Sequence, residues 1–385
     1  MSRTLLLPLL FAGASLASWQ SLGIPTSRTG ATLSVKAFNI GNLTIGGTAT
    51  VVHPVLPGRE TTTVPMFGFL LERTIGTGPS AKTYQYVWDL GIRKDPENAV
   101  PPVAELFKAF PGALDEPKDI TELLVAGGVK LESIEQVFWS HAHLDHIGDM
   151  SKFPNSTGLV IGAATNTTPY PANPASQLQP SDFAGHTLSK VDFTTSKLLI
   201  NNLRAVDYFN DGSFYLLDTP GHIAGHMTGL ARVSTSPPSF VLLAGDTAHQ
   251  IGAVRPRPLL QKHFPCPAHV LADARAHVST DFFWSSGSKL GQFDLLTRSE
   301  QMLDLADVPG GLYADQPTAV VSLDKVALFD ADPDVFVVIA HDVSLLGAMP
   351  VFPQTLNGWK KGGLKERTVW RFLQPDNPAF IFSPV

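Results

Sequence analysis

The chain has 385 residues, of which 44% are hydrophobic and 16% are charged, and its formal net charge is −6. This length can bury a sizeable core, in one large domain or two smaller ones. The chain contains no run of Lys and Arg, and its acidic balance argues against a nucleic-acid partner.

The first residues, MSRTLLLPLLFAGASLASWQ, place one Arg before an apolar stretch and small residues after it. This pattern predicts a secretory signal peptide over residues 1–18; the alternative is an apolar arm packed on a cytoplasmic protein. The stretch is too short to span a bilayer, and no other segment approaches that length. Sequons at Asn42, Asn155 and Asn166 also favour secretion and predict a glycoprotein. The lone Cys266 cannot form an internal disulfide and does not identify the compartment.

Periodicity and turn residues divide the chain into short strands and helices. Strands rich in β-branched and aromatic residues are predicted over 31–40, 62–72, 83–91, 135–139, 158–163, 213–219, 239–246 and 335–342. Helices are predicted over 102–109, 120–128, 298–307 and 317–330. Strands first and then strands mixed with helices, without an obvious linker, favour one domain over residues 31–385. Two packed sheets covered by helices would suit this order.

The stretch SHAHLDHIGD, at residues 140–149, concentrates histidine and aspartate directly after a predicted strand. In an extended segment, residues two apart point the same way, so His141 and His143 can converge on one metal ion. Asp145 and His146, at the start of the next turn, can reach a second ion beside it. Imidazole and carboxylate together suit zinc, and also Fe, Mn or Co.

Three other predicted strands carry a candidate ligand just beyond their ends. These ligands are His222 in DTPGH, Asp246 in LLAGD and His341 in VIAHD. Groups beyond strand ends converge on one edge of an open sheet, where ligands commonly bind. The seven residues together predict a site for two divalent metal ions.

In this order HAHLDH, TPGH, AGD and AHD resemble the metallo-β-lactamase superfamily, from about residue 32 to the C-terminus. The resemblance implies an α/β fold, an αββα sandwich of two mixed β-sheets flanked by helices. It implies that metal 1 is held by His141, His143 and His222. It implies that metal 2 is held by Asp145, His146 and His341, with Asp246 bridging the two ions. Asp89, in WDLG, would orient a ligand histidine from outside, and His226 is a second candidate for such a role.

Within the superfamily, PGHIAGH with Asp246 and His341 is similar to the quorum-quenching lactonases and related esterases. The closing stretch FPQTLNGWKKGGLKERTVWRFL is similar to fungal members. One departure concerns His249, three residues after Asp246, where the lactonases carry a Tyr that contacts the substrate carbonyl. Acyl hydrolysis is therefore expected, whereas lactone specificity is left open.

Two divalent ions about 3.5–4 Å apart would share a water, lower its pKa to about 7 and direct the hydroxide at an acyl carbonyl. The expected reaction is the opening of a lactone or ester. Asp145 and His249 are the candidate catalytic residues; His249 can pass a proton to the leaving group or donate to the oxyanion. The alternatives are a thioesterase, a lactamase, a persulfide dioxygenase or a metal-binding protein without activity. A glutathione thioester would need cations, for which Arg255 and Arg257 are the nearby candidates.

Residues 273–310 form a possible lid or insert. The segment holds Phe282, Phe283, Trp284 and Phe293. These aromatic side chains predict either ordinary packing or one wall of an apolar substrate pocket. The expected partner is a small, apolar acyl substrate, and the sequence leaves the oligomeric state open.

Overall fold

The computed structural model describes residues 18–115, 118–283 and 301–385. The predicted signal peptide lies outside these residues except for its last position, and so do Trp284 and Phe293 of the possible lid. Within the described ranges, no helix combines the length and apolar character needed to cross a membrane.

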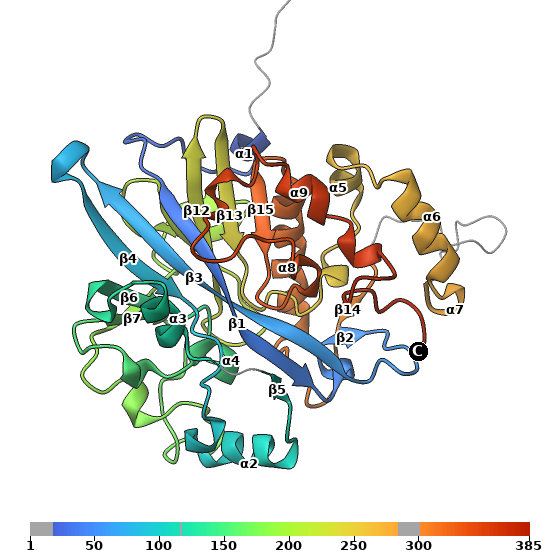
Figure 1. Ribbon diagram of the computed structural model, residues 1–385, viewed down its shortest axis with the longest axis horizontal. Coiled ribbons are helices and arrows are strands. Elements are labelled where there is room, and N and C mark those ends of the chain that lie inside the picture. Colours follow the sequence, from blue (N-terminus) through green and yellow to red (C-terminus); the bar gives the residue numbers. More distant parts are fainter. Residues whose placement is uncertain (1–17, 116–117, 284–300) are drawn as a thin grey trace, which may run out of the picture.

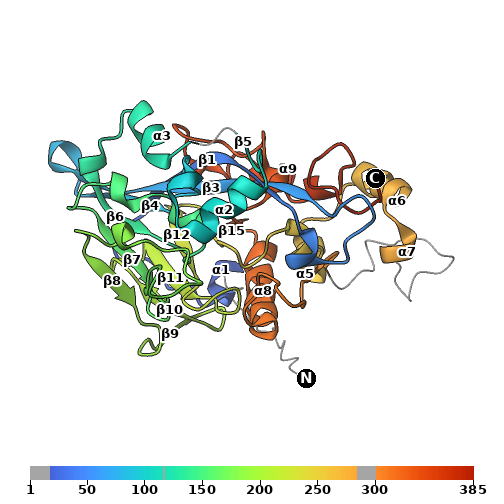
Figure 2. The ribbon, with the colours of Figure 1, turned by 90° about the horizontal axis from the view of Figure 1, so that it is seen from below.

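Within the described residues, the first sheet has seven strands in the order β5-β1-β3-β4-β6-β7-β8. Its strands are β1 (Leu33–Ile45), β3 (Thr62–Ile75), β4 (Lys82–Trp88), β5 (Leu114–Asp115), β6 (Ile134–Phe138), β7 (Gly158–Gly162) and β8 (Leu188–Val191). In the sheet order, neighbouring strands from β5 to β4 pair antiparallel, and neighbouring strands from β4 to β8 pair parallel. The sheet is therefore mixed, and β1 and β3 form its long ribbon (Figures 1 and 2).

In the same part of the chain, the second sheet has six strands in the order β15-β13-β12-β11-β10-β9. These strands are β9 (Leu198–Ile200), β10 (Leu203–Asp207), β11 (Phe214–Asp218), β12 (Met227–Thr235), β13 (Pro238–Leu243) and β15 (Val335–Val338). Neighbours pair antiparallel except β13 and β15, which are parallel, so this sheet is mixed as well. A separate two-stranded ribbon joins β2 (Val52–His53) to β14 (Asp304–Leu305).

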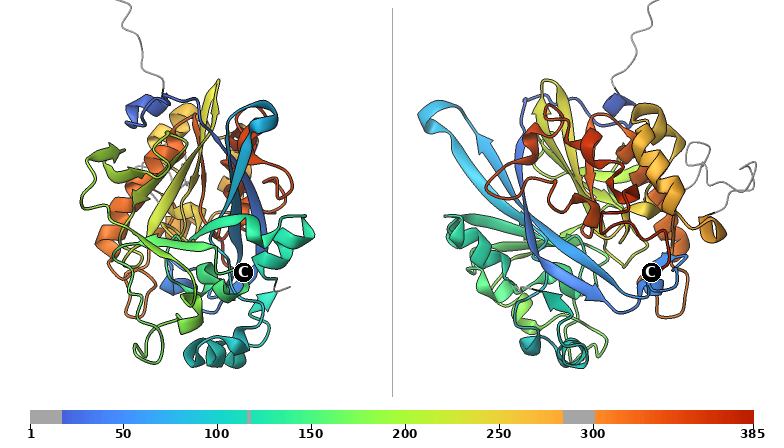
Figure 3. Two further views of the ribbon diagram at one scale, coloured as in Figure 1. Left: turned by 90° about the vertical axis from the view of Figure 1, so that its left-hand side faces the viewer. Right: turned by 45° about the vertical axis from the view of Figure 1, so that its right-hand side comes forward.

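The two sheets pack face to face, with helices on their outer faces (Figure 3). Between the sheets lies an apolar layer in which Phe138 contacts Phe214, with ring centroids 5.6 Å apart. Helix α3 (Ile120–Ala126) covers the outer face of the first sheet, and α8 (Gln316–Ala331) covers that of the second. The predicted αββα sandwich is confirmed.

The other helices are short and sit mostly at the edges. They are α1 (Ser18–Ser21), α2 (Pro101–Ala109), α4 (Leu144–Ile147), α5 (Pro258–His263), α6 (Ala268–His277), α7 (Thr280–Phe283) and α9 (Leu364–Thr368). The helices predicted over 102–109, 120–128 and 317–330 correspond to α2, α3 and α8. For α3, a capping box of Asp119 and Glu122 explains its start, and Gly127 its end.

The helix predicted over 298–307 is wrong in its described part, because residues 304–305 form β14 and pair with β2. The backbone N–H groups of Met302 and Leu303 both reach the Gly252 carbonyl, at 2.9 and 3.0 Å. These bonds outside the segment replace the bonds of a helix. The helical spacing of the apolar residues reflects burial of an irregular segment.

Secretion and glycosylation remain predictions. The fold indicates which of the three sequons can accept a glycan. Asn42 lies within β1 opposite partners on both sides, in β3 and β5, and its side-chain oxygen is buried. Asn155 and Asn166 are exposed. We expect a eukaryotic host to remove the leader near Ala17 or Ser18 and to place glycans on Asn155 or Asn166, but not on Asn42.

Intact mass before and after deglycosylation measures both steps. The double substitution Asn155→Gln, Asn166→Gln should abolish the mass shift. A shift that survives in this variant would contradict the assignment, and an unprocessed chain retained in the cell would contradict secretion.

Candidate metal centre

The candidate ligands follow strands of both sheets and meet at one end of the sandwich. Strand β6 leads into the loop with His141, and β11, β13 and β15 lead to His222, Asp246 and His341. Four segments far apart in the sequence thus come together, as the strand-end pattern predicted. They form two groups, and within each group the ligand atoms all lie within 4.8 Å of one another.

Backbone hydrogen bonds fix these loops to one another. The Met227 N–H donates to the Ser140 carbonyl at 2.9 Å, and the Ala340 N–H donates to the Gly245 carbonyl at 3.0 Å. Gly245 has φ +51°, and an added Cβ would lie 2.9 Å from Nε2 of His226. A glycine is therefore required directly before Asp246.

The first cluster contains His141, His143 and His222. Nε2 of His141 lies 3.0 Å from Nδ1 of His143, and Nε2 of His222 lies 3.1 and 2.9 Å from these two atoms. Burial lowers the pKa of all three histidines, so the rings are neutral. Asp246 Oδ2 is 3.6 Å from His141 Nε2 and 3.5 Å from His222 Nε2. Three converging imidazole nitrogens and one carboxylate oxygen are a donor set that suits zinc.

The second cluster contains Asp145, His146, Asp246 and His341. Nε2 of His341 lies 3.3 Å from Asp145 Oδ2 and 3.2 Å from Asp246 Oδ1, and Nε2 of His146 lies 3.2 Å from that same Asp246 oxygen. Burial opposes charge on both rings, yet the negative charge of Asp246 raises the pKa of His146 well above its ordinary value and that of His341 to about 10. The carboxylates of this cluster therefore favour positive charge at this position.

Several buried atoms of the second cluster lack a hydrogen-bond partner within the described part of the chain. They are His146 Nε2, His341 Nε2 and Asp246 Oδ1. Buried polar atoms are normally satisfied, and leaving one unpaired costs about 1–3 kcal/mol. The residues therefore fit a metal ion at this position.

Asp246 is shared by the two clusters, because Oδ1 faces the second and Oδ2 the first. Burial would raise its pKa, but the charges of His146 and His341 outweigh burial and place the pKa well below the ordinary value. The carboxylate is thus ionised, and each of its two oxygens is available to one of the two clusters.

Residues outside the clusters orient the ligands. Asp89 lies 2.9 Å from Nδ1 of His146 through one oxygen and accepts the Ser140 N–H at 2.6 Å through the other. His226 lies 2.9 Å from the Thr219 carbonyl through Nδ1 and accepts the Asp246 N–H at 3.1 Å through Nε2. Burial lowers the pKa of His226 to about 4, which keeps Nε2 free to accept. The predicted contact between Asp89 and a candidate ligand histidine is present.

His249 is buried beside Asp246. Its Nε2 lies 3.2 Å from Asp246 Oδ2, and its Nδ1 lies 2.7 Å from the hydroxyl of Tyr313. Tyr313 was not among the residues expected at the site. Nothing in the sequence around it marks it, because it lies in a loop far downstream of the histidine it contacts.

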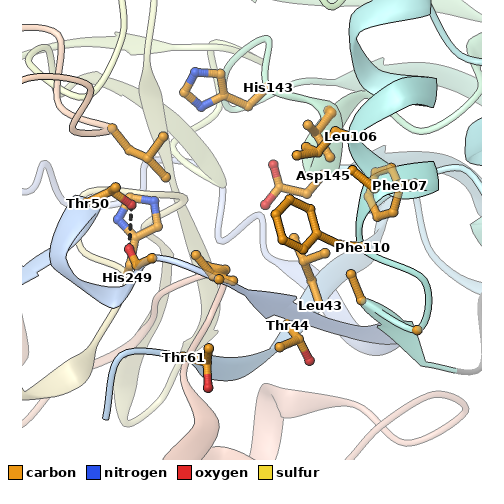
Figure 4. Close-up of a pocket in the computed structure, with 18 of the residues that line it drawn as sticks. Leu43, Thr44, Thr50, Thr61, Leu106, Phe107, Phe110, His143, Asp145 and His249 are labelled. Atoms are coloured by element: carbon orange, nitrogen blue, oxygen red, sulfur yellow. Dashed lines mark hydrogen bonds between the residues drawn. The ribbon is translucent and has the colours of Figure 1, made fainter. Parts of the chain in front are cut away.

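A cavity of about 840 Å³ opens onto the clusters. His143, Asp145, Asp246 and His249 are among its lining residues. Its apolar wall comes from β1 and from the end of α2, and its members include Leu43, Ile45, Leu106, Phe107 and Phe110. Figure 4 shows the rings of Phe107 and Phe110 beside Asp145, with His249 on the opposite side. None of the described residues lining the cavity is a lysine or arginine.

The described residues of the possible lid, 273–283 and 301–310, do not line this cavity. Phe283 instead packs in the core against Phe382, with ring centroids 5.5 Å apart. Arg255 does not face the cavity either, because it forms a buried two-pronged bond with Asp330, at 2.8 Å for each contact. Arg257 bonds Asp324 at 2.9 Å.

Two mixed sheets between helices, with two candidate ligand clusters sharing one carboxylate at the strand ends, define an αββα protein with a candidate metal centre. The family model described as "Metallo-beta-lactamase superfamily" matches residues 109–279. "Metallo-hydrolase mfmC" of Annulohypoxylon moriforme is 33% identical over 93% of this chain and 91% of its own length. "Gamma-lactamase FDB1" of Fusarium pseudograminearum is 33% identical over 85% of this chain and 78% of its own. The chain belongs to the metallo-beta-lactamase superfamily, among its hydrolases.

Two further comparisons differ in how much of the other protein they cover. "Cytochrome P450 monooxygenase mpaDE" of Penicillium roqueforti is 34% identical over 92% of this chain, which spans only 38% of that protein. A solved structure of an N-acyl homoserine lactone hydrolase has a TM-score of 0.51 and 15% identity, and covers 86% of this chain and 100% of that one. At this identity the structural likeness shows the fold alone. The predicted resemblance to the superfamily and to its lactonase-like, fungal members is confirmed.

Proposed function

We propose that this protein is a dinuclear metal-dependent hydrolase that opens a lactone or ester. The observation that carries the proposal is Asp246, whose two oxygens face two separate ligand clusters at the base of an apolar cavity. Zinc is the proposed metal, because the first cluster supplies three imidazoles and one carboxylate. Fe, Mn or Co remain alternatives that elemental analysis separates.

Bound divalent ions would supply a nucleophilic water at neutral pH and positive charge near the developing oxyanion. The chain's own residues supply the remaining steps. Asp145 lines the cavity, and the neighbouring histidines, against the effect of burial, lower its pKa to about 2. Its carboxylate faces the cavity, and this position makes it the candidate for carrying a proton to the leaving alkoxide. His249, also in the cavity wall, is placed to donate to the carbonyl oxygen.

The cavity favours a neutral substrate with an apolar group. Leucine, isoleucine and phenylalanine side chains line it, and the described lining residues include no lysine or arginine that could pair with a substrate carboxylate. The arginines considered for a glutathione thioester are engaged elsewhere. A small neutral lactone or ester therefore fits better than a glutathione thioester or a carboxylate-bearing β-lactam.

A second candidate is hydrolysis of a γ-lactam, which the relative named "Gamma-lactamase FDB1" favours. The same cavity would hold a neutral lactam, and the same residues would act on its carbonyl. The difference lies in the leaving group, because an amide nitrogen must be protonated before it departs. Both activities would use the same site, so the relative rates on γ-lactams and on lactones or esters distinguish them.

A hydrolysis screen with metal analysis tests the proposal. We expect two transition-metal ions per chain and the highest kcat/KM on neutral lactones or esters, with γ-lactams next. Glutathione thioesters and β-lactams should react much more slowly. One tightly bound ion with full activity would exclude the dinuclear mechanism, and a preference for carboxylate-bearing substrates would exclude the substrate class.

The apolar wall gives a prediction about substrate preference. Phe110→Ala should raise KM about 10-fold for substrates with a large apolar group, because burying a phenylalanine against an apolar partner contributes about 1.5–3 kcal/mol. The kcat should change little, since the ring of Phe110 can neither bind a metal nor transfer a proton. Glu105→Ala, in the adjoining helix α2, is the matched control, because Glu105 is exposed and does not line the cavity. Equal changes for small and large substrates would contradict this assignment.

A further inference from the structure

Tyr313 is held against the loop that carries His222. The residue after it, Ala314, donates its N–H to the His222 carbonyl at 2.8 Å, and Leu312 before it donates to the Thr50 carbonyl at 2.9 Å. The tyrosine ring lies 5.5 Å from the His222 ring between centroids and is 7% exposed. Leu312 and His249 line the cavity, whereas Tyr313 does not. Its side chain therefore lies behind His249 and does not contact a substrate directly.

The hydroxyl of Tyr313 has one clear partner for its hydrogen. Its oxygen lies 2.7 Å from Nδ1 of His249, and the His249 backbone N–H also interacts with this oxygen. Burial, with a smaller contribution from the charge of Asp246, raises the pKa of Tyr313 well above its ordinary value, so the hydroxyl keeps its proton. An oxygen that accepts from the backbone can direct this hydrogen to Nδ1.

The other nitrogen of His249 requires the same arrangement. Nε2 lies 3.2 Å from Oδ2 of Asp246, a carboxylate oxygen whose lone pairs accept hydrogen bonds. A lone pair on Nε2 would face the lone pairs of this oxygen, whereas an N–H on Nε2 would donate to it. Both neighbours of the ring therefore favour one tautomer, with the hydrogen on Nε2.

We propose that Tyr313 is a positioning residue that fixes His249 as the Nε2–H tautomer. The imidazole then directs an N–H toward Asp246 Oδ2 and the adjoining cavity, not a lone pair that would act as a base or as an additional metal ligand. The role of this donor in hydrolysis rests on the proposed function, whereas the tautomer itself does not. In Tyr313→Phe the ring still packs against His222, but Nδ1 loses its donor and both tautomers become accessible.

The test combines NMR with kinetics on the zinc-loaded full chain. In protein with ¹⁵N-labelled histidine, long-range ¹H–¹⁵N correlations distinguish a protonated from an unprotonated ring nitrogen, and His249→Asn identifies the His249 signals. We expect Nε2–H with a bare Nδ1 in the wild type, and loss of this preference in Tyr313→Phe. That variant should also lose at least about 10-fold in kcat with little change in KM, because a misoriented or wrongly protonated histidine is a poor donor.

Tyr208→Phe is the matched control. It removes the hydroxyl that donates to Oε1 of Gln136 at 2.8 Å, away from both clusters, and should change neither the His249 signals nor kcat. A wild-type His249 that carries its hydrogen on Nδ1 would overturn the proposal. An unchanged tautomer in Tyr313→Phe, or a loss of activity matched by a loss of metal, would also overturn it. Because the NMR measurement needs no substrate, an enzyme inactive on every lactone and ester would contradict the proposed function alone.

Discussion

Asp246→Ala is expected to remove metal from both clusters and to lower kcat/KM roughly 10³-fold or more. Asp246 supplies one oxygen to each cluster, within 3.2 Å of His146 and His341 on one side and 3.5 Å of His222 on the other. Removing the carboxylate also removes the negative charge that would balance two divalent ions in a buried place. Elemental analysis and kinetics on the same preparation measure both effects.

Variants in the individual clusters provide the contrast. His143→Ala removes a candidate ligand from the first cluster only, and His341→Ala from the second only. Each should retain about one ion per chain, whereas Asp246→Ala should retain none. Asp192→Ala is the control, because this acid is exposed and bonds only within its own turn. Two ions retained in Asp246→Ala would contradict a shared ligand.

The convergence of the candidate ligands was predictable because it follows from local rules. Buried strands leave short apolar runs in the sequence, and groups just beyond the ends of neighbouring strands gather at one edge of a sheet. His222, Asp246 and His341 each come after such a run, and the structure brings all three together with the residues of 140–149. The spacing of His141 and His143 similarly anticipated that they would share a cluster.

The cavity was not predictable for the opposite reason. Residues 101–109 carry the pattern of an ordinary amphipathic helix, whose apolar side would normally pack on the core. In the structure Val103 alone among these residues is buried, and Leu106 and Phe107 line the cavity. Only the tertiary position of α2, beside β5 and close to α4, reveals this role (Figure 1). For the aromatic residues of 273–310 the sequence predicted either a wall of the substrate pocket or ordinary packing, and Phe283 packs in the core.

The contact between Tyr313 and His249 could not be predicted from the sequence either. Sixty-four positions separate the two residues. The contact depends on how the loop before α8 is pinned to the His222 loop by backbone bonds. No periodicity reports such a pairing, whereas the departure at His249 was visible, because that residue has a fixed offset from Asp246. Sequence motifs therefore identify the candidate site residues, whereas only the tertiary packing identifies the residues that contact them from outside the site.

His249→Ala is expected to lower kcat about 10²-fold on both unactivated lactones and activated aryl esters, with both ions retained. In the proposed tautomer Nδ1 accepts from Tyr313, 2.7 Å away, so His249 has only its Nε2–H to offer. Transferring that proton would leave an imidazolate, which is unfavourable beside Asp246. His249 should therefore stabilise the oxyanion, which forms with either leaving group, while Asp145 carries the proton.

Substrates that differ only in their leaving group decide this point. A general acid matters for an alkoxide and hardly at all for a nitrophenolate, so a loss confined to lactones and alkyl esters would mean that His249 transfers a proton. His249→Gln, which keeps an N–H donor without a titratable ring, should recover part of the loss on both substrate types. Metal content is measured first, because His249 lies 3.2 Å from the carboxylate that both clusters share. Full activity in His249→Ala with two ions bound would remove this residue from the mechanism and leave the oxyanion to the metals.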